Sequence, residues 1–337
     1  MLLLVSPAPP SAVLGNGVTA DRWCRILADL GHEVETSDHY ATGQYTGLIA
    51  LHAGKSGDSV LKFRSAHPDA PVVLALTGTD LYPSLTANGV DPAVLAAADR
   101  IVVLQQRALD QVPPTHRDRT RVIVQSMPPI APEPADDSVF EVAFLAHLRS
   151  VKDPLLAANA ARLLPPESRI RITHVGAGLD DELAIAAKAE ASSNARYDWL
   201  GALPRPEALK VLARSRLLIL TSRHEGGANV VTEALAAGVP VLSTAIAGSV
   251  GLLGEDYPGY FPVGDAQALS VLLRAAELDL NDVYTRLAAA CGERSHIVDP
   301  LTESNAWASL LGELSIPVPP RKDRACEGSP YGRPRPP

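Results

Sequence analysis

The sequence predicts an α/β protein built from two Rossmann-like domains, each a doubly wound parallel sheet with helices on both faces. Short apolar runs alternate with amphipathic helical segments along most of the 337 residues, which is the pattern of successive βαβ units. The segment 127–138, rich in proline and acidic residues, interrupts this alternation and has the composition of a linker. The length also suits two domains that each bury a core.

The first series of elements precedes this segment. We expect strands wherever a short apolar run is bounded by polar or turn residues, namely at 2–5, 33–36, 48–51, 72–76, 101–104 and 122–124. Helices fall between these strands, and the first of them is expected over 18–30. We therefore assign residues 1–127 to an N-terminal domain and residues 128–138 to the linker.

A second series follows the linker. Its expected strands are 142–145, 171–175, 196–200, 217–220 and 240–242, and its helices include 154–164, 206–214 and 230–237. Gly238 follows the last of these helices and is expected to close it. We assign residues 139–316 to a C-terminal domain. Residues 317–337 are rich in proline and poor in large apolar side chains, so we expect a disordered tail.

The amino-acid composition argues against several classes of function. The net charge of −8 argues against nucleic acid or an anionic membrane as the main partner, so we expect small-molecule substrates. Three scattered cysteines without metal-ligand spacing predict a reducing, cytoplasmic compartment, no disulfide and no structural zinc. The opening MLLLV is too short and lacks the basic residues of a signal peptide, and no later run is long enough to insert into a membrane. The oligomeric state stays open.

The segment Glu225–Glu233, EGGANVVTE, carries the clearest functional pattern. Its glycines lie at a strand-to-helix turn, where open backbone N–H groups and a positive helix end favour a phosphate. Two carboxylates eight positions apart suit one ligand with two hydroxyl-bearing parts, a glycosyl ring near Glu225 and a ribose near Glu233. Spacing alone favours a capped helix with solvated glutamates, but the glycines and flanking strand favour a nucleotide-sugar pocket. Its donor-binding candidates are Gly226, Gly227, Ala228, Asn229, Val230 and Glu233.

Basic residues follow the first strand of the second domain. In HLRSVKDP, Arg149 and Lys152 are expected to project from the carboxyl end of that strand, so that the guanidinium forks onto a diphosphate and the ammonium acts as a point charge. A basic pair in a loop is more often solvated surface, but this location favours function. His147 is a further candidate that contacts the sugar or orders the loop.

The first domain offers candidates for the opposite wall of a cleft. Gly15, Asn16 and Gly17 follow the first strand and form an incomplete dinucleotide fingerprint, which also disfavours an NAD-dependent oxidoreductase. We interpret them as a loop that lets a ligand approach the backbone on the donor side. Acceptor-binding candidates follow the third and fourth strands, and for Asp80 a helix-capping role is an equal alternative. These candidates are His52, Lys55, Thr77, Thr79 and Asp80.

Several segments carry a family resemblance. SRHEGGANVVTEALAAGVPVL resembles the donor-site motif of family 4 glycosyltransferases, which have the GT-B architecture, and HLRSVKDP resembles their diphosphate-binding Arg and Lys region. Together with SPAPP, GNGVTA, LTGTDLY and AGSVGLLGEDYPGYFPVGD, these segments are similar in order and spacing to one subgroup, the selenosugar synthases of selenoneine biosynthesis. The resemblance covers Met1 to about Trp307. Gly54-Lys55 departs from the more basic stretch expected there, which affects the acceptor side.

The resemblance implies transfer of a sugar, N-acetylglucosamine or glucose, from a UDP-sugar to the selenium of selenophosphate, with release of UDP. The catalytic residues would be Arg149, Lys152 and Glu225. An ionised selenium needs no strong general base, by analogy with a thiolate, and no Asp-x-Asp motif occurs, so we expect no metal and no cofactor. Two alternatives stay open: a family 4 enzyme that glycosylates a hydroxyl of a small molecule or lipid, and a non-catalytic nucleotide-sugar binding protein.

Overall fold

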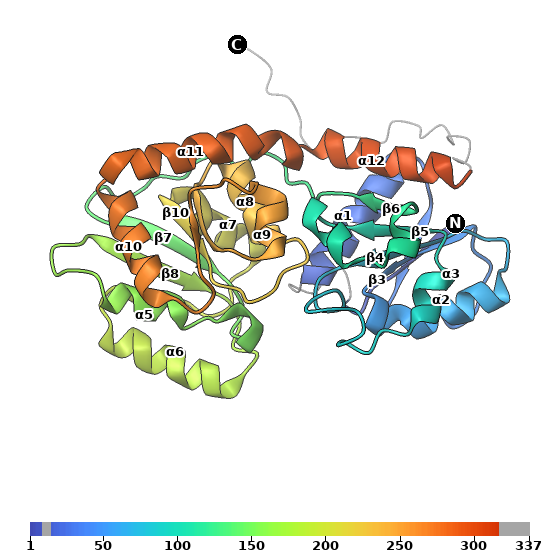
Figure 1. The fold of residues 1–337 in the computed structure, drawn as a ribbon, viewed down its shortest axis with the longest axis horizontal. Helices are drawn as coiled ribbons and strands as arrows, with labels where there is room; N and C mark the ends of the chain where they lie inside the picture. The colour runs from blue at the N-terminus through green and yellow to red at the C-terminus, as the bar shows by residue number, and fades with distance from the viewer. Residues whose placement is uncertain (9–14, 317–337) are drawn as a thin grey trace, which may run out of the picture.

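The computed structural model describes residues 1–8 and 15–316 and contains two parallel sheets, each at the centre of its own lobe (Figure 1). The strand order is β2-β1-β3-β4-β5-β6 in the first sheet and β12-β11-β10-β7-β8-β9 in the second. The second order is that of a doubly wound dinucleotide-binding sheet, with β7 as its first strand. The predicted fold class of two parallel-sheet α/β domains is therefore confirmed.

The first sheet follows the prediction closely. Three of its strands are entirely buried and apolar, as expected for parallel strands covered on both faces. Its strands are β1 Leu2–Val5, β2 Val34–Ser37, β3 Gly47–Leu51, β4 Val72–Leu76, β5 Arg100–Val103 and β6 Thr120–Val122. Its helices are α1 Gly15–Asp29, α2 Ala53–Ala66, α3 Pro92–Ala97, α4 Pro114–Arg117 and the short η1 Gln106–Gln111. The last strand lies two residues before the predicted 122–124, because its register pairs Thr120 with Ile101 of β5.

The second sheet contains one strand that the sequence pattern did not predict. That strand, β12, has only two residues and is defined by its pairing with β11. Two residues are too few to show a periodic pattern in the sequence. The strands are β7 Phe140–Leu145, β8 Ile170–Val175, β9 Tyr197–Trp199, β10 Leu217–Leu220, β11 Val241–Thr244 and β12 Tyr260–Phe261. The helices are α5 Leu156–Arg162, α6 Asp181–Ser193, α7 Arg205–Arg214, α8 Asn229–Ala237, α9 Ala247–Leu253, α10 Ala266–Glu277 and α11 Val283–Arg294, with the short η2 Ser150–Lys152, η3 Leu280–Asp282 and η4 Ser295–Val298.

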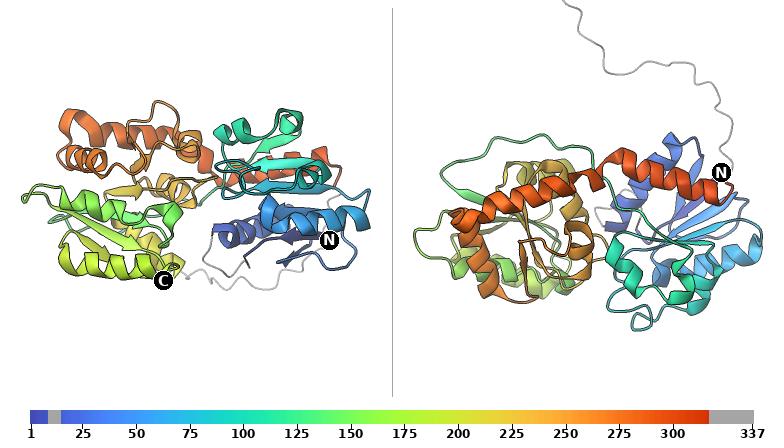
Figure 2. Two further views of the ribbon diagram at one scale, coloured as in Figure 1. Left: turned by 60° about the horizontal axis from the view of Figure 1, so that its bottom comes forward. Right: turned by 45° about the horizontal axis from the view of Figure 1, so that its top comes forward.

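The last described helix, α12 Pro300–Glu313, departs from the predicted domain assignment. It follows α11 but packs against α1 of the first domain, where the Trp307 and Trp23 rings lie 4.7 Å apart between centroids. Glu313 pairs with Arg100 and Arg121 of the first sheet. Helices α11 and α12 follow one another and together extend across both lobes (Figure 1 and Figure 2). Assigning all of 139–316 to the second domain was wrong for α12, because an amphipathic pattern does not reveal which core it covers. The tail prediction for 317–337 lies outside the described residues.

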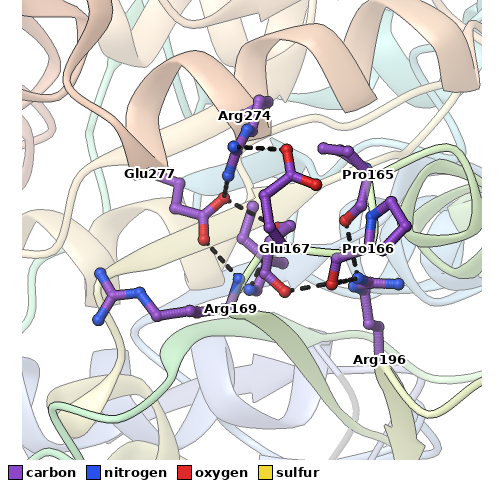
Figure 3. A network of polar contacts seen from close by, with 9 residues as sticks. Pro165, Pro166, Glu167, Arg169, Arg196, Arg274 and Glu277 are labelled. Carbon is purple, nitrogen blue, oxygen red and sulfur yellow. Dashed lines mark hydrogen bonds and ion pairs between the residues drawn. The ribbon is translucent and has the colours of Figure 1, made fainter.

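A buried carboxylate ties α10 to the loop that precedes β8. The Glu277 side chain is 2% exposed and accepts hydrogen bonds from the Arg169 N–H, the Ser168 hydroxyl and the Arg274 guanidinium (Figure 3). Burial alone raises the pKa of Glu277, but these hydrogen bonds together outweigh it and lower the pKa. Arg196 donates to the carbonyl oxygen of Pro165 in the same loop, at 2.8 Å. The network holds the amino-terminal edge of the second sheet, opposite the edge at which its strands end.

Candidate functional site

A cavity of about 500 Å³ lies between the two domains. In each domain its lining residues follow the carboxyl ends of strands: β1, β3, β4, β5 and β6 in the first sheet, β7, β8, β9 and β10 in the second. Both sheets reverse their strand order there, between β1 and β3 and between β7 and β10. Open α/β sheets bind ligands at such switch points. The cavity is therefore the candidate site.

The structure brings most of the predicted site residues to this cavity. Those that line it are Gly15, Asn16, Lys55, Thr77, Thr79, His147, Arg149, Lys152, Glu225, Gly226, Gly227, Ala228, Asn229, Val230 and Glu233. Gly17, His52 and Asp80 do not line it; all three are buried elsewhere. Gly15, Asn16 and Gly17 are not the loop that we predicted. They form the first turn of α1, which begins three residues earlier than expected.

The glycines before α8 lie directly against the first domain. A Cβ atom at Gly226 would lie 2.4 Å from the carbonyl oxygen of Thr77 and 2.6 Å from the Cα of Gly78. A Cβ at Gly227 would lie 2.6 Å from the Cβ of Leu104. From the sequence, we attribute these glycines to the open backbone N–H groups that a phosphate would need. The structure adds a second reason, because only glycine permits this backbone contact across the interface.

Lys152 and Glu225 form an ion pair on the cavity wall. Lys152 Nζ lies 2.5 Å from Glu225 Oε1, and the same oxygen accepts the Ser222 hydroxyl at 2.6 Å. The Lys152 carbonyl accepts a hydrogen bond from the Thr221 hydroxyl at 2.6 Å, which attaches η2 to the end of β10. An ammonium has three N–H donors. With one directed at Glu225, two remain for an anionic ligand.

Glu233 is almost fully buried, 5% exposed, and pairs with Arg205 at 2.7 Å between Nη2 and Oε1. Burial raises the pKa of this carboxyl, and Arg205 and Arg22 oppose that effect. The sequence prediction omitted Arg205, which is the first residue of α7 and also lines the cavity. Its place in the turn after a predicted strand was the available signal, since such turns reach the carboxyl edge of the sheet.

Asp80 has a structural role rather than the predicted role in acceptor binding. Its fully buried carboxylate accepts hydrogen bonds from the backbone N–H groups of Ala53 (2.8 Å), Thr77 (3.0 Å) and Gly78 (2.8 Å). The alternative of a helix-capping role describes it better, because Ala53 begins α2. Asp80 thereby holds the loop that carries Thr77 and Thr79 into the cavity.

His52 caps the same helix. Its Nδ1 accepts the Lys55 N–H at 3.2 Å, so the proton lies on Nε2, which donates to the Thr79 hydroxyl at 2.9 Å. Burial lowers the pKa of His52, although the Asp80 charge opposes this effect. His52 therefore positions Thr79 and Lys55 instead of contacting a ligand itself.

We expect Asp80→Asn to lower the free energy of unfolding by about 2 kcal/mol, because the new amide presents a donor where backbone N–H groups need an acceptor. Equilibrium urea unfolding measures this loss. Asp58→Asn, an exposed position of α2 paired with Lys62, is the matched control and should change stability by less than about 0.5 kcal/mol. Equal stability of the two variants would contradict the capping role.

A buried histidine forms a hydrogen bond to a residue of the cavity wall. His174 on β8 is completely buried; its Nε2 donates to the Ala146 carbonyl at 2.8 Å and its Nδ1 accepts the Tyr197 hydroxyl at 2.6 Å. Burial lowers its pKa from 6.5 to about 4. Between these two values the unfolded chain binds a proton that the folded chain does not, so this group lowers stability as pH falls from 6.5 to 4.

We expect this effect to reach about 3 kcal/mol at pH 4, at 1.36 kcal/mol for each pKa unit. Urea unfolding at pH 7 and pH 4 measures it, with the wild type losing more stability between the two than His174→Gln. The surface variant His296→Gln should follow the wild type. An identical loss in His174→Gln would show that other groups cause the pH dependence.

Comparisons with known proteins agree with this geometry. Residues 130–294 match the family model of glycosyl transferases group 1. No curated protein sequence matches this chain. The matched residues include the end of the linker and the second domain as far as α11, and so contain the Lys152–Glu225 and Arg205–Glu233 pairs.

Solved structures of the same architecture cover nearly the whole chain. HepE of Anabaena, in complex with UDP and glucose, has a TM-score of 0.69 at 16% identity, over 93% of this chain and 99% of its own. Sucrose-phosphate synthase from Thermosynechococcus elongatus has a TM-score of 0.71 at 17% identity, over 93% and 97%. A glycosyltransferase from Rickettsia africae has a TM-score of 0.72 at 14% identity, over 93% and 98%. These likenesses establish the GT-B fold.

Within residues 1–8 and 15–316, no helix is both long and apolar enough to cross a bilayer.

Proposed function

We propose that this protein is a metal-independent glycosyltransferase that transfers a hexose, N-acetylglucosamine or glucose, from a UDP-sugar to the selenium of selenophosphate. The group 1 domain, the cavity at two switch points and the UDP-bound neighbours support a UDP-sugar as donor. The sequence resemblance to selenosugar synthases supports the acceptor. Selenium bonds to the anomeric carbon as the bond from that carbon to UDP breaks, and UDP leaves with the electron pair. Transfer of the phosphoryl group to water then yields the selenosugar.

The observation that carries the choice of acceptor is the chemistry of the first-domain wall. Among the described residues, those of this domain that line the cavity include no carboxylate and no imidazole. Asp80 and His52, the candidates for a general base in this domain, are buried and hydrogen-bonded to the loops. A hydroxyl acceptor needs a base to take its proton, whereas an ionised selenium does not. Lys55, Thr77 and Thr79 offer an anion one ammonium and two hydroxyls.

The departing UDP is stabilised from the second domain. Lys152 and Arg149 supply positive charge, and the start of α8 supplies open backbone N–H groups and a positive helix end. Glu225 orients Lys152 and is placed to accept hydrogen bonds from sugar hydroxyls, and Glu233 is placed to accept those of the ribose. Catalysis then rests on positioning and charge stabilisation.

The test is an anaerobic incubation of the purified protein with UDP-N-acetylglucosamine or UDP-glucose and selenophosphate, following UDP release and product mass. We expect a selenium-bearing sugar that is absent when either substrate is omitted, and an unchanged rate when a chelator is added. UDP release only with a hydroxyl acceptor would favour the conventional family 4 reaction. Binding of a UDP-sugar without any release would favour a non-catalytic binding protein. A rate abolished by the chelator and restored by magnesium would overturn metal independence.

A further inference from the structure

One part of the cavity wall is built by both domains. One face of α1 carries Thr19 and Arg22, three residues apart, and one face of α8 carries Asn229 and Glu233, four residues apart. Gln125, from the segment after β6, completes the group. All of these except Arg22 line the cavity. The group therefore joins first-domain side chains to the helix that holds Glu233.

The orientation of the Gln125 amide is determined by its neighbour. The Thr19 hydroxyl donates to the carbonyl oxygen of Gly15 at 2.9 Å, so its oxygen is left to accept a hydrogen bond, which it receives from Gln125 Nε2. The amide oxygen must then point away from Thr19. Gln125 is 2% exposed, and its Oε1 is buried with no partner among the described residues. An unpaired buried acceptor destabilises the site, and a ligand that donates a hydrogen bond to it would recover that cost.

Arg22 orients a second amide of the group. Its Nη2 donates to Asn229 Oδ1 at 2.8 Å, and because a guanidinium has only donors, Asn229 must turn its oxygen to Arg22 and its NH₂ away. This hydrogen bond joins α1 to the first residue of α8 across the domain interface. This part of the cavity wall thus offers an acceptor from Gln125, the carboxylate of Glu233 and the donors of the Asn229 amide.

We propose that Gln125 is a specificity residue for the nucleotide, and that its Oε1 accepts a hydrogen bond from a ribose hydroxyl held beside Glu233. The inference rests on the proposed function, in which the cavity binds a UDP-sugar. The diphosphate of such a ligand offers only acceptors, so it does not satisfy Gln125. A hydroxyl donates and accepts at once, and so it suits a site with both kinds of partner. The first domain then recognises the nucleotide together with the group 1 domain.

The test is a binding cycle measured by isothermal titration calorimetry with UDP, 2′-deoxy-UDP and 3′-deoxy-UDP. We expect the wild type to bind one deoxy nucleotide about tenfold more weakly than UDP, which is the loss of one hydrogen bond of about 1.4 kcal/mol. Gln125→Ala should bind UDP about tenfold more weakly and no longer distinguish that deoxy nucleotide from UDP. Gln125→Met, which keeps the side-chain volume, should behave in the same way. Gln44→Ala, at an exposed position outside the cavity, should match the wild type.

Each outcome separates this inference from the proposed function. If the Gln125 variants weaken UDP and both deoxy nucleotides by the same factor, Gln125 only supports the fold of the site, and the inference is overturned. Variants that bind all three nucleotides like the wild type also overturn it. A wild type that discriminates by hydroxyl while its Gln125 variants do not supports it. A wild type that binds no UDP would overturn the proposed function itself.

Discussion

Lys152→Ala should lower kcat by about a hundred- to a thousandfold, which is the usual effect of removing one group that stabilises developing charge. The Lys152 side chain is 26% exposed, directs one N–H at Glu225 and lines the cavity, where negative charge develops on the departing UDP in the proposed reaction. The binding of UDP should weaken less than kcat falls, because the charge on the leaving group grows in the transition state. Initial rates of UDP release and separate titrations of UDP measure the two effects.

The matched control for this variant is Lys210→Ala. Lys210 lies on α7 of the same domain, 53% exposed and paired with Glu207, and does not line the cavity. Its kcat should stay within about twofold of the wild type, since surface ion pairs contribute little. Lys152→Arg should recover part of the activity, because it restores the charge but not the compact geometry of the ammonium. A Lys152→Ala enzyme with more than half of the wild-type kcat would contradict the role of Lys152.

Gly226→Ala should lower kcat about a hundredfold while leaving both domains folded. The added methyl group would lie 2.4 Å from the Thr77 carbonyl oxygen, and its nearest neighbours are all backbone atoms of Thr77 and Gly78, so no flexible side chain can give way. The domains must move apart to make room. A displacement of about 1 Å between catalytic groups and substrate is enough for such a loss. Turnover measures the effect, and small-angle scattering should detect a larger radius of gyration.

Gly292→Ala is the control for this variant. Gly292 lies in α11, also in the second domain, and a Cβ there would meet nothing within 4 Å. This variant should keep full activity and gain about 0.5–1 kcal/mol of stability from the higher helix propensity of alanine. If Gly226→Ala retains wild-type turnover, the close contact between the domains is not required for the reaction.

Local patterns were enough to predict the buried strands and the motifs that follow them. The apolar runs of β1, β4 and β10 match their predicted bounds, because a parallel strand buried on both faces leaves a short, strongly apolar stretch. The turns after these strands had to meet at one edge of each sheet. The same rule placed Arg149, Lys152, Glu225 and Glu233 together without any knowledge of side-chain contacts.

Three features depended on contacts between distant parts of the chain. The sequence left Asp80 as a candidate for binding the acceptor, and only the structure shows its three backbone hydrogen bonds. Gln125 and Arg205 belong to no sequence motif, although both line the cavity. The amphipathic pattern of α12 is satisfied equally by either core, so only packing places it on the first domain.

The sequence by itself therefore determined two parallel α/β domains and the residues that carry charge at their strand ends. Periodicity and turn chemistry are local, and they act through neighbouring residues. The tertiary structure alone decided which side chains reach the cavity, which ones hold its loops, and how the Gly226 turn meets the Thr77 loop. Those properties arise where segments remote in the chain compete for the same space and the same hydrogen bonds.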